Sequence, residues 1–226
     1  MRLVARDTRL VVFTGPSLRP GDLEMLRAVA AAAGRSLELR RPVRRLDLLE
    51  LAPGCDVLML DGEFGQSLAV SITEIRAVLA TGQPLAGASS MGALRAVECR
   101  PLGMTGSGWV FEQYLTGAIE SDGDVALLYD PDDYQPVTIP LVNVRWLLAV
   151  HELPAADAAA ALEVAHSLHF RSRRPTVLAR AWQRRLPAAV ADVLVPELAD
   201  ERRDTWDRKR LDAIAAVRGA LDLEAA

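Results

Sequence analysis

The sequence contains few of the residues on which many functional classes depend. Cysteine occurs twice, as Cys55 and Cys99, and neither residue belongs to a Cys-x-x-Cys pair or to a Cys/His cluster. This excludes a framework of several disulfides and a zinc site with the usual spacing, and it fits a reducing, cytoplasmic compartment. Histidine occurs three times, always after residue 150. A catalytic serine earlier in the chain therefore has no histidine nearby in sequence to act as its base.

The chain also lacks an excess of basic charge. Its 26 Lys and Arg residues are outnumbered by 30 Asp and Glu residues, which gives a formal net charge of −4. No uninterrupted apolar stretch approaches the ~20 residues that a membrane helix needs. The first residues, MRLVARDTRLVVF, mix charges with apolar residues and contain no small-residue cleavage site. We therefore expect a cytoplasmic protein that binds neither nucleic acid nor a membrane.

Half of the residues are apolar, which is enough to fill one sizeable core. Continuous apolar runs at 10–13 and 56–60 are typical of strands buried on both faces of a parallel sheet, and residues 37–39 alternate like a more exposed strand. Apolar residues at helical spacing over 22–33 and 68–80 predict helices between these strands. The alternation predicts a doubly wound α/β fold with a mainly parallel sheet.

The pattern changes after Cys99. Residues 103–109 (GMTGSGW) indicate a glycine-rich loop, and residues 110–119 indicate a short helix. The sequence ESDGD predicts an acidic turn, and VALLY at 125–129 is a possible strand.

From Pro140 onward almost every segment predicts helix. The prolines expected at helix starts are Pro154, Pro175 and Pro187. Apolar spacing over 211–221 marks a last amphipathic helix. We therefore expect an α/β core at residues 1–139 and a C-terminal helical extension at residues 140–226 that packs on this core.

Three loops of unusual composition follow predicted strands. Gly15-Pro16-Ser17 follows the first strand, DGEF at 61–64 follows the strand DVLML, and GASSMG at 87–92 follows the strand around Leu85. The carboxyl ends of parallel strands meet at one edge of the sheet, where helix N-termini also present free amide groups. The loops combine small residues, hydroxyls and carboxylates, so this edge is the predicted ligand site.

The GASSMG segment has three alternative interpretations. It can be an incomplete nucleophile elbow, because the G-x-S-x-G window lacks its first glycine around Ser90 and its second around Ser89. It can be an anion cradle, in which amides and hydroxyls at Ser89, Ser90 and Met91 point out of a helix N-terminus. It can also be an N-cap serine followed by close packing at Gly92.

Other polar clusters give weaker signals. His166 and His169 are three residues apart, but no carboxylate or cysteine completes a recognisable metal site. Asp122 and Asp124 lack the remaining ligands of a calcium loop. The basic run RSRR at 171–174 is either a solvated face or a patch for an acidic partner. We predict no metal site.

The motifs and their order resemble the TfuA-like family. The matching stretches are VVFTGPSL, the strand that ends in DGEF, GASSMGALRAVE, GMTGSGWVFEQY, ESDGDVAL and PLVNVR. They extend from Val11 to Arg145, and GASSMGALRA is the most specific of them. The helical remainder carries no comparable signature.

This resemblance implies a partner of a YcaO-type ATP-dependent enzyme that makes backbone thioamides on a ribosomally synthesised peptide. It implies release of sulfide from a thiocarboxylated, ubiquitin-like sulfur-carrier protein, or another form of sulfur delivery to YcaO. The carrier's Gly-Gly thiocarboxylate tail is an anion that suits a glycine-lined crevice. No cofactor is expected. The leading hypothesis is a thiocarboxylate hydrolase, and the alternatives are a non-catalytic scaffold that docks YcaO and carrier, or a serine hydrolase acting on small esters.

The residues and the resemblance together give two sets of candidates. The catalytic candidates are Asp61, Glu63, Ser89, Ser90, Arg95 and Glu98. The ligand-binding candidates are Gly15, Pro16, Ser17, Gly62, Phe64, Gly87, Met91, Gly92, Asn143 and Arg145.

Each catalytic candidate has an expected role. Donors at Ser89 to Met91 would stabilise the charge that develops on the attacked carbonyl. Arg95 would bind the thiocarboxylate or hold a neighbouring carboxylate, either Glu98 or Asp61. Asp61, Glu63 or Glu98 would act in proton transfer.

Two positions depart from the family pattern. Relatives often have a histidine in the helix after the DG motif, where this chain reads AVSITEIR, with Ser71 and Ile72. A mechanism that uses this histidine as a base is therefore not implied here. Cys99 stands where an apolar residue is expected, so a persulfide relay through Cys99 is not implied either.

Overall fold

The computed structural model describes residues 9–65 and 68–221. Residues 1–8, whose composition argued against a signal peptide, lie outside the described residues. The chain forms two compact units, of which the first consists of the residues up to Glu120 and from Arg210 onward, and the second of Ser121–Lys209. The first compact unit ends at Glu120 and resumes at Arg210. The domain boundary expected between residues 139 and 140 stays a prediction.

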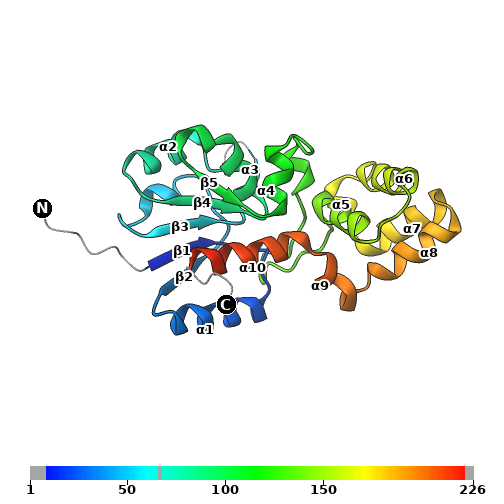
Figure 1. Cartoon of the computed structure of the whole chain (residues 1–226), viewed down its shortest axis with the longest axis horizontal. Coiled ribbons are helices and arrows are strands. Elements are labelled where there is room, and N and C mark those ends of the chain that lie inside the picture. The colour runs from blue at the N-terminus through cyan, green and yellow to red at the C-terminus, as the bar shows by residue number, and fades with distance from the viewer. Residues whose placement is uncertain (1–8, 66–67, 222–226) are drawn as a thin grey trace, which may run out of the picture. The chain divides into compact units, whose positions relative to one another are not determined.

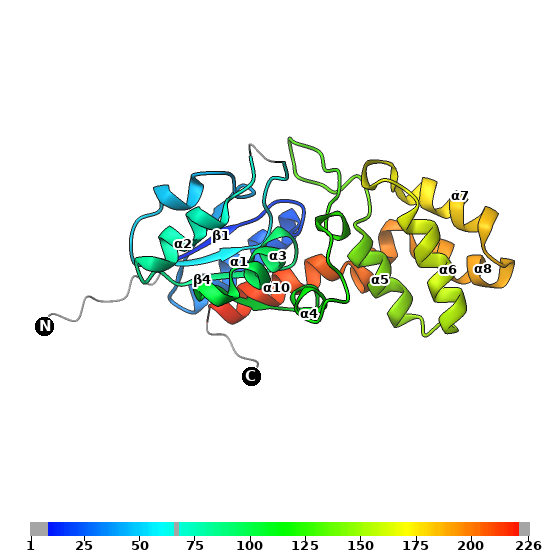
Figure 2. The ribbon, with the colours of Figure 1, turned by 90° about the horizontal axis from the view of Figure 1, so that it is seen from above.

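The first unit contains a parallel sheet, seen from two sides in Figures 1 and 2. Its strands are β1 (Arg9–Phe13), β2 (Ser36–Arg40), β3 (Asp56–Met59), β4 (Leu85–Ala88) and β5 (Thr105–Ser107). They are ordered β2-β1-β3-β4-β5, and every pair is parallel. This confirms the predicted mainly parallel α/β fold, and the strand order changes direction between β1 and β3.

Helices cover both faces of this sheet (Figure 1). They are α1 (Pro20–Ala32), α2 (Ile72–Ala80), α3 (Met91–Glu98), α4 (Trp109–Leu115) and α10 (Arg208–Ala220). Leu26 of α1 and Val217 of α10 pack with Leu10, Val12 and Leu58 in one buried apolar cluster. Every second side chain of a strand points to the same face, so Leu10, Val12 and Leu58 face α1 and α10 together. These two helices therefore share one face of the sheet.

Two carboxylates join α10 to segments about a hundred residues or more away in sequence. Arg210 donates two hydrogen bonds to Asp22 of α1, at 2.7 and 2.6 Å. Asp212 accepts the amides of Trp109 and Val110, at 3.1 and 2.8 Å, and so caps α4. Gly108, with φ of 94°, leaves room for this carboxylate, because a Cβ there would lie 2.6 Å from the Asp212 carboxyl carbon.

Two local predictions after Cys99 are wrong. The expected loop GMTGSGW contains strand β5, where a Cβ on Gly106 would lie 2.2 Å from the ring of Phe111, so the glycine allows α4 to pack on the strand. Within residues 9–65 and 68–221, the possible strand VALLY joins no ladder, and its Tyr129 forms an isolated antiparallel bridge with Pro136. Proline has no amide hydrogen, so it cannot extend the pairing.

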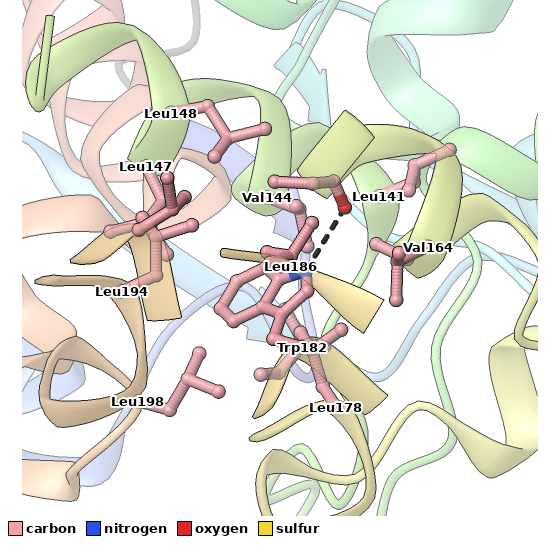
Figure 3. Packing of buried hydrophobic residues seen from close by; sticks show 14 of the residues in the cluster. Leu141, Val144, Leu147, Leu148, Val164, Leu178, Trp182, Leu186, Leu194 and Leu198 are labelled. Carbon is pink, nitrogen blue, oxygen red and sulfur yellow. Dashed lines mark hydrogen bonds between the residues drawn. The ribbon is translucent and has the colours of Figure 1, made fainter. Parts of the chain in front are cut away.

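The second unit is helical, as predicted for this part of the chain. Its helices are α5 (Leu141–Val150), α6 (Ala155–His166), α7 (Pro175–Arg185), α8 (Ala188–Glu197) and α9 (Arg203–Trp206). Figure 3 shows Trp182 in the middle of its apolar core, where the indole Nε1 donates to the Ala161 carbonyl oxygen at 3.0 Å. Within the described residues, no helix of either unit is long and apolar enough to span a membrane.

Candidate functional site

Two of the three predicted loops meet at the Asp61 carboxylate. One carboxylate oxygen of Asp61 accepts the backbone amides of Gly15 and Ser17, each at 2.9 Å. The other accepts the Ser17 hydroxyl at 2.7 Å. The loop after β1 is therefore folded around the carboxylate that follows β3, at the point where the strand order changes direction. Ligands of doubly wound proteins bind at such switch points.

The third loop joins through Ser89. The Ser89 hydroxyl donates to the Ser17 hydroxyl oxygen at 2.8 Å, and Ser17 in turn donates to Asp61. All three side chains are buried, with exposed fractions of 0 %, 1 % and 3 % for Ser89, Ser17 and Asp61. This confirms that the three loops share one edge, and it creates a continuous donor chain from Ser89 through Ser17 to a carboxylate, which we call the serine relay.

Ser89 has a strained backbone at the joint between β4 and α3. Its φ is 68°, in the left-handed region that a serine rarely adopts. The Ser90 amide donates to the Ala88 carbonyl oxygen at 2.8 Å, across Ser89. This is a γ-turn of the strained, positive-φ kind. Strain of this type costs about 1–3 kcal/mol and persists only where the surrounding packing enforces it.

The packing that enforces the turn comes from two glycines. A Cβ on Gly87 would lie 2.0 Å from the Gly92 carbonyl oxygen, and a Cβ on Gly92 would lie 1.8 Å from the Met59 carbonyl oxygen. The Gly92 amide also donates to the Leu60 carbonyl oxygen at 3.1 Å. Helix α3 thus approaches β3 and β4 closely, and the residue at the apex of the resulting elbow is Ser89, not Ser90.

Ser90 occupies the N-cap position of α3, but its side chain makes no capping hydrogen bond. Its amide is already bonded to Ala88. Met91 is the first residue of α3, so its amide has no carbonyl within the helix to bond. The alternative of a capping serine therefore finds no side-chain cap at Ser90. Of the amides considered for an anion cradle, that of Ser90 already donates within the turn.

The remaining charged candidates form ion pairs outside the serine relay. Arg95 forms an ion pair with Glu98, one turn along α3. Glu63 pairs with Arg44 at 3.2 Å, near the surface. Among the described residues neither Arg95 nor Glu98 bonds to Asp61, so of the two alternatives given for a carboxylate partner of Arg95 the structure selects Glu98.

One polar group at this edge has no counterpart in the sequence-based predictions. Thr14 precedes Gly15, is 6 % exposed, and its hydroxyl oxygen has no hydrogen-bond partner among the described residues. Buried hydroxyls are nearly always satisfied, by protein atoms, water or a ligand. No sequence pattern distinguishes such a threonine, because its isolation depends on how the loop after β1 folds around Asp61.

The other ligand-binding candidates of the first unit shape the loops. Gly62 pairs with Val43 in a parallel bridge, and a Cβ on Gly62 would meet the Met91 sulfur at 2.5 Å. Pro16 and Phe64 are half-buried. Gly62 thus leaves room for the Met91 side chain, which would have to shift if residue 62 had a Cβ.

Asn143 and Arg145 belong to the second unit. The Asn143 amide donates to Asp207 at 2.8 Å and its oxygen accepts the Lys209 amide at 3.1 Å. Arg145 donates to Asp124 at 3.0 Å. These bonds give both residues structural partners inside that unit, and their role in ligand binding stays a prediction.

Neither cysteine suits a sulfur relay. Cys55 and Cys99 are buried, and neither forms a disulfide among the described residues. Burial, and then the negative charge of Glu98, raise the pKa of the Cys99 thiol above its usual range, and a thiol that does not ionise is a poor nucleophile. Within the described part of the chain, no group of three or more His, Cys, Asp or Glu side chains is arranged to hold a metal ion.

The histidines lie in the second unit. His166 and His169 line a cavity of about 330 Å³ together with Asp124, Phe170 and Arg173. The His169 ring contacts the Phe170 ring in a tilted arrangement, with 4.5 Å between ring centroids. The hydrogen bonds of the serine relay therefore include no histidine of the kind that a Ser-His-Asp triad uses as its base, and their acceptor is Asp61.

The sequence model of the TfuA-like family matches residues 61–174. The chain belongs to the TfuA-like family. The match includes Asp61 and Ser89, whereas Ser17 lies outside the matched residues. No curated protein matches this TfuA-like chain.

Proposed function

We propose that this TfuA-like protein delivers sulfur to a YcaO-type enzyme in peptide backbone thioamidation, by hydrolysing the thiocarboxylate of a ubiquitin-like sulfur-carrier protein. The observation that carries the proposal is the serine relay at a strained strand-to-helix turn. A serine at this position is the arrangement that hydrolases use to present a nucleophile. Membership of the TfuA-like family supports the YcaO partner, the peptide product and the carrier as parts of this proposal.

The serine relay supplies a route for the proton. The Ser89 hydroxyl attacks the thiocarboxylate carbon while its proton passes through Ser17 to Asp61. The carbon–sulfur bond then breaks, and the sulfur leaves as HS⁻ with that proton. Water hydrolyses the resulting ester, which restores Ser89 and releases the carrier carboxylate and one proton. The sum is RCOS⁻ + H₂O → RCOO⁻ + HS⁻ + H⁺.

Two further features support a carrier tail as substrate. Ser89 is 0 % exposed, so a substrate reaches its hydroxyl only if the loops around it part. A Gly-Gly end, which has no side chains, needs the smallest opening. The first amide of α3, at Met91, lies at a helix N-terminus, where backbone dipoles favour a negative charge. It is the donor that we assign to the oxyanion of the attacked carbonyl.

The test uses purified protein and thiocarboxylated carrier, with sulfide and carrier mass measured over time. We expect hydrolysis without YcaO, its loss in Ser89→Ala, and a residual rate within about tenfold of wild type in Ser90→Ala, whose hydroxyl makes no bond in the relay. Carrier that stays intact with and without YcaO would instead favour the non-catalytic scaffold. Hydrolysis of small esters but not of the carrier would favour a general serine hydrolase.

A further inference from the structure

We infer that the Thr14 hydroxyl holds the main chain of the carrier's C-terminal tail, a few residues before the thiocarboxylate. Thr14 follows β1 directly and is 6 % exposed, and its hydroxyl oxygen has no hydrogen-bond partner among the described residues. The inference rests on the proposed function for the identity of the ligand, whereas the placement of the hydroxyl is a property of the first unit.

The backbone of Thr14 belongs to the sheet. Its amide donates to the Arg40 carbonyl oxygen at 2.9 Å, which continues the ladder between β1 and β2 by one residue. Side chains alternate along a strand, so Thr14 lies on the face that carries Val12. The next residue, Gly15, already donates its amide to Asp61. Thr14 is therefore held by the sheet directly before the loop that joins the serine relay.

Apolar residues occupy the corresponding positions on the neighbouring strands. Strand β1 pairs with β3, and β3 with β4, in one continuous register. This register places Leu60 and Ala88, two members of a buried apolar cluster, in one row with Thr14. A valine has nearly the shape of a threonine and suits such a row, whereas a buried hydroxyl without a partner lowers stability. The row thus contains a polar group that the packing of the fold does not require.

A peptide carbonyl oxygen suits this hydroxyl better than a buried water does. A buried water typically makes about three hydrogen bonds to polar groups. The side chains of Leu60 and Ala88 offer it none, and the Phe13 carbonyl oxygen already accepts the Leu60 amide at 2.9 Å. A carbonyl oxygen of an extended peptide needs one donor, which a threonine hydroxyl supplies.

The separation of the strand ends decides which part of the tail Thr14 holds. Ser89 follows β4 and Thr14 follows β1, with β3 between these strands. Neighbouring strands lie about 4.8 Å apart, so the two positions are separated by roughly 10 Å. An extended chain covers about 3.3 Å for each residue, so with the thiocarboxylate at Ser89 the carbonyl held by Thr14 lies about three residues earlier. Thr14 therefore contacts the tail before its Gly-Gly end.

The experiment compares Thr14→Val with wild type, using two forms of the host's ubiquitin-like sulfur carrier. The form with an ordinary Gly-Gly carboxylate requires no chemistry, and we expect its Kd to rise about tenfold, because the variant leaves the tail carbonyl without its donor. For the thiocarboxylated form, KM should rise by a similar factor while kcat stays within about twofold of wild type. This split is expected because the bond to Thr14 lies away from the reacting carbon and forms equally in the ground and transition states.

Two further variants separate binding from folding. Thr14→Ser keeps the hydroxyl and should return the Kd to within about threefold of wild type. Thr138→Val is the matched control, since the buried Thr138 hydroxyl oxygen accepts the Leu128 amide at 2.7 Å in the second unit. It should lower the Tm by about 2–4 °C and leave the Kd unchanged. Thr14→Val should not lower the Tm, because the Thr14 hydroxyl has no partner among the described residues.

The outcomes separate this inference from the proposed function. Wild-type Kd and KM values in Thr14→Val, together with hydrolysis that depends on Ser89, would overturn the tail contact and keep the proposed function. A fall in both Tm and kcat in Thr14→Val would give Thr14 a structural role and also overturn the contact. A weaker Kd in Thr14→Val, although wild-type protein releases no sulfide, would keep the contact and overturn hydrolysis. Failure of wild-type protein to bind the carrier would overturn both.

Discussion

Buried polar groups are arranged differently in the two units. At the sheet edge of the first unit, Ser89 at a strained turn donates to Ser17, which donates to Asp61. The Thr14 hydroxyl has no partner among the described residues. In the second unit the buried guanidinium of Arg173 donates to the carbonyl oxygens of Ala165, Ile139 and Leu168 at 3.2, 3.0 and 3.1 Å.

Buried polar groups serve stability in one unit and suit chemistry in the other. The Arg173 guanidinium donates to backbone carbonyl oxygens between helices, so these bonds hold the second unit together and include no group that readily takes up a proton. The bonds of the serine relay end on a carboxylate beside a strained serine, where a proton can move. Strain and an unsatisfied hydroxyl lower stability, and we infer that they persist at this edge because the site binds a substrate there.

Removing the proton acceptor of the serine relay should have the largest effect on the chemistry of the first unit. Asp61→Asn should lower the rate of sulfide release about 10³–10⁴-fold, because the relay then ends on an amide that accepts a proton poorly. Glu63→Gln is the matched control, since Glu63 bonds Arg44 near the surface, and it should change the rate less than about threefold. Equal losses in both variants would show that the general negative charge of the loop matters, not the relay.

The corresponding change in the second unit should affect stability without affecting chemistry. Arg173→Met leaves three buried carbonyl oxygens without their donor, and we expect the second unit to lose about 3–5 kcal/mol of unfolding free energy. Urea denaturation followed by tryptophan fluorescence measures this, because Trp182 lies in that core. Arg184→Met, an exposed change on α7 in the same unit, should cost less than about 0.5 kcal/mol. Burial, opposed by the charge of Asp124, lowers the pKa of Arg173.

The Asp22–Arg210 pair tests whether the first unit also contains purely structural polar contacts. Burial raises the pKa of Asp22, but the hydrogen bond and charge of Arg210 and the amide of Arg19 outweigh burial and lower the pKa below 3.8. The pair therefore stabilises the fold fully above the unfolded pKa, and this contribution is lost as pH falls through the lower folded pKa. Asp22→Asn should cost about 1–3 kcal/mol at pH 7 and progressively less below pH 3.8. Glu24→Gln, exposed on α1, should show neither the cost nor the pH dependence.

Much of this organisation could be predicted from the sequence. Apolar runs gave β1 and β3, and the composition of the loops at Gly15, Asp61 and Ser89 correctly predicted a shared edge. Strand β5 was missed because a glycine-rich segment has little β propensity of its own. Its pairing with β4 and the contact of Gly106 with Phe111 depend on the tertiary fold.

The choice between the two serines could not be predicted. It depends on the contact of Gly92 with the Met59 carbonyl, which sets the turn at Ser89. Contacts between residues far apart in sequence could not be predicted either. Asp212 caps α4 from about a hundred residues away, and nothing in the local pattern around either segment indicates the other.

The backbone strain at Ser89 should have the smallest effect on the free energy of unfolding. It tests whether stability and activity can be changed separately at this residue. Ser89→Gly relieves the positive φ but removes the hydroxyl, whereas Ser89→Ala removes the hydroxyl and keeps the strain. We expect the glycine variant to be more stable than the alanine variant by about 1 kcal/mol, measured by urea denaturation, with both inactive. Equal stability of the two variants would mean that the turn is not strained.

The most direct test of the serine relay is rapid-quench mass spectrometry of wild-type protein mixed with thiocarboxylated carrier. Our account predicts a transient adduct with the mass of the carrier acyl group, mapped to Ser89, which forms as sulfide is released and is absent in Ser89→Ala. An adduct mapped to Ser90, or hydrolysis at the wild-type rate by Ser89→Ala, would contradict it.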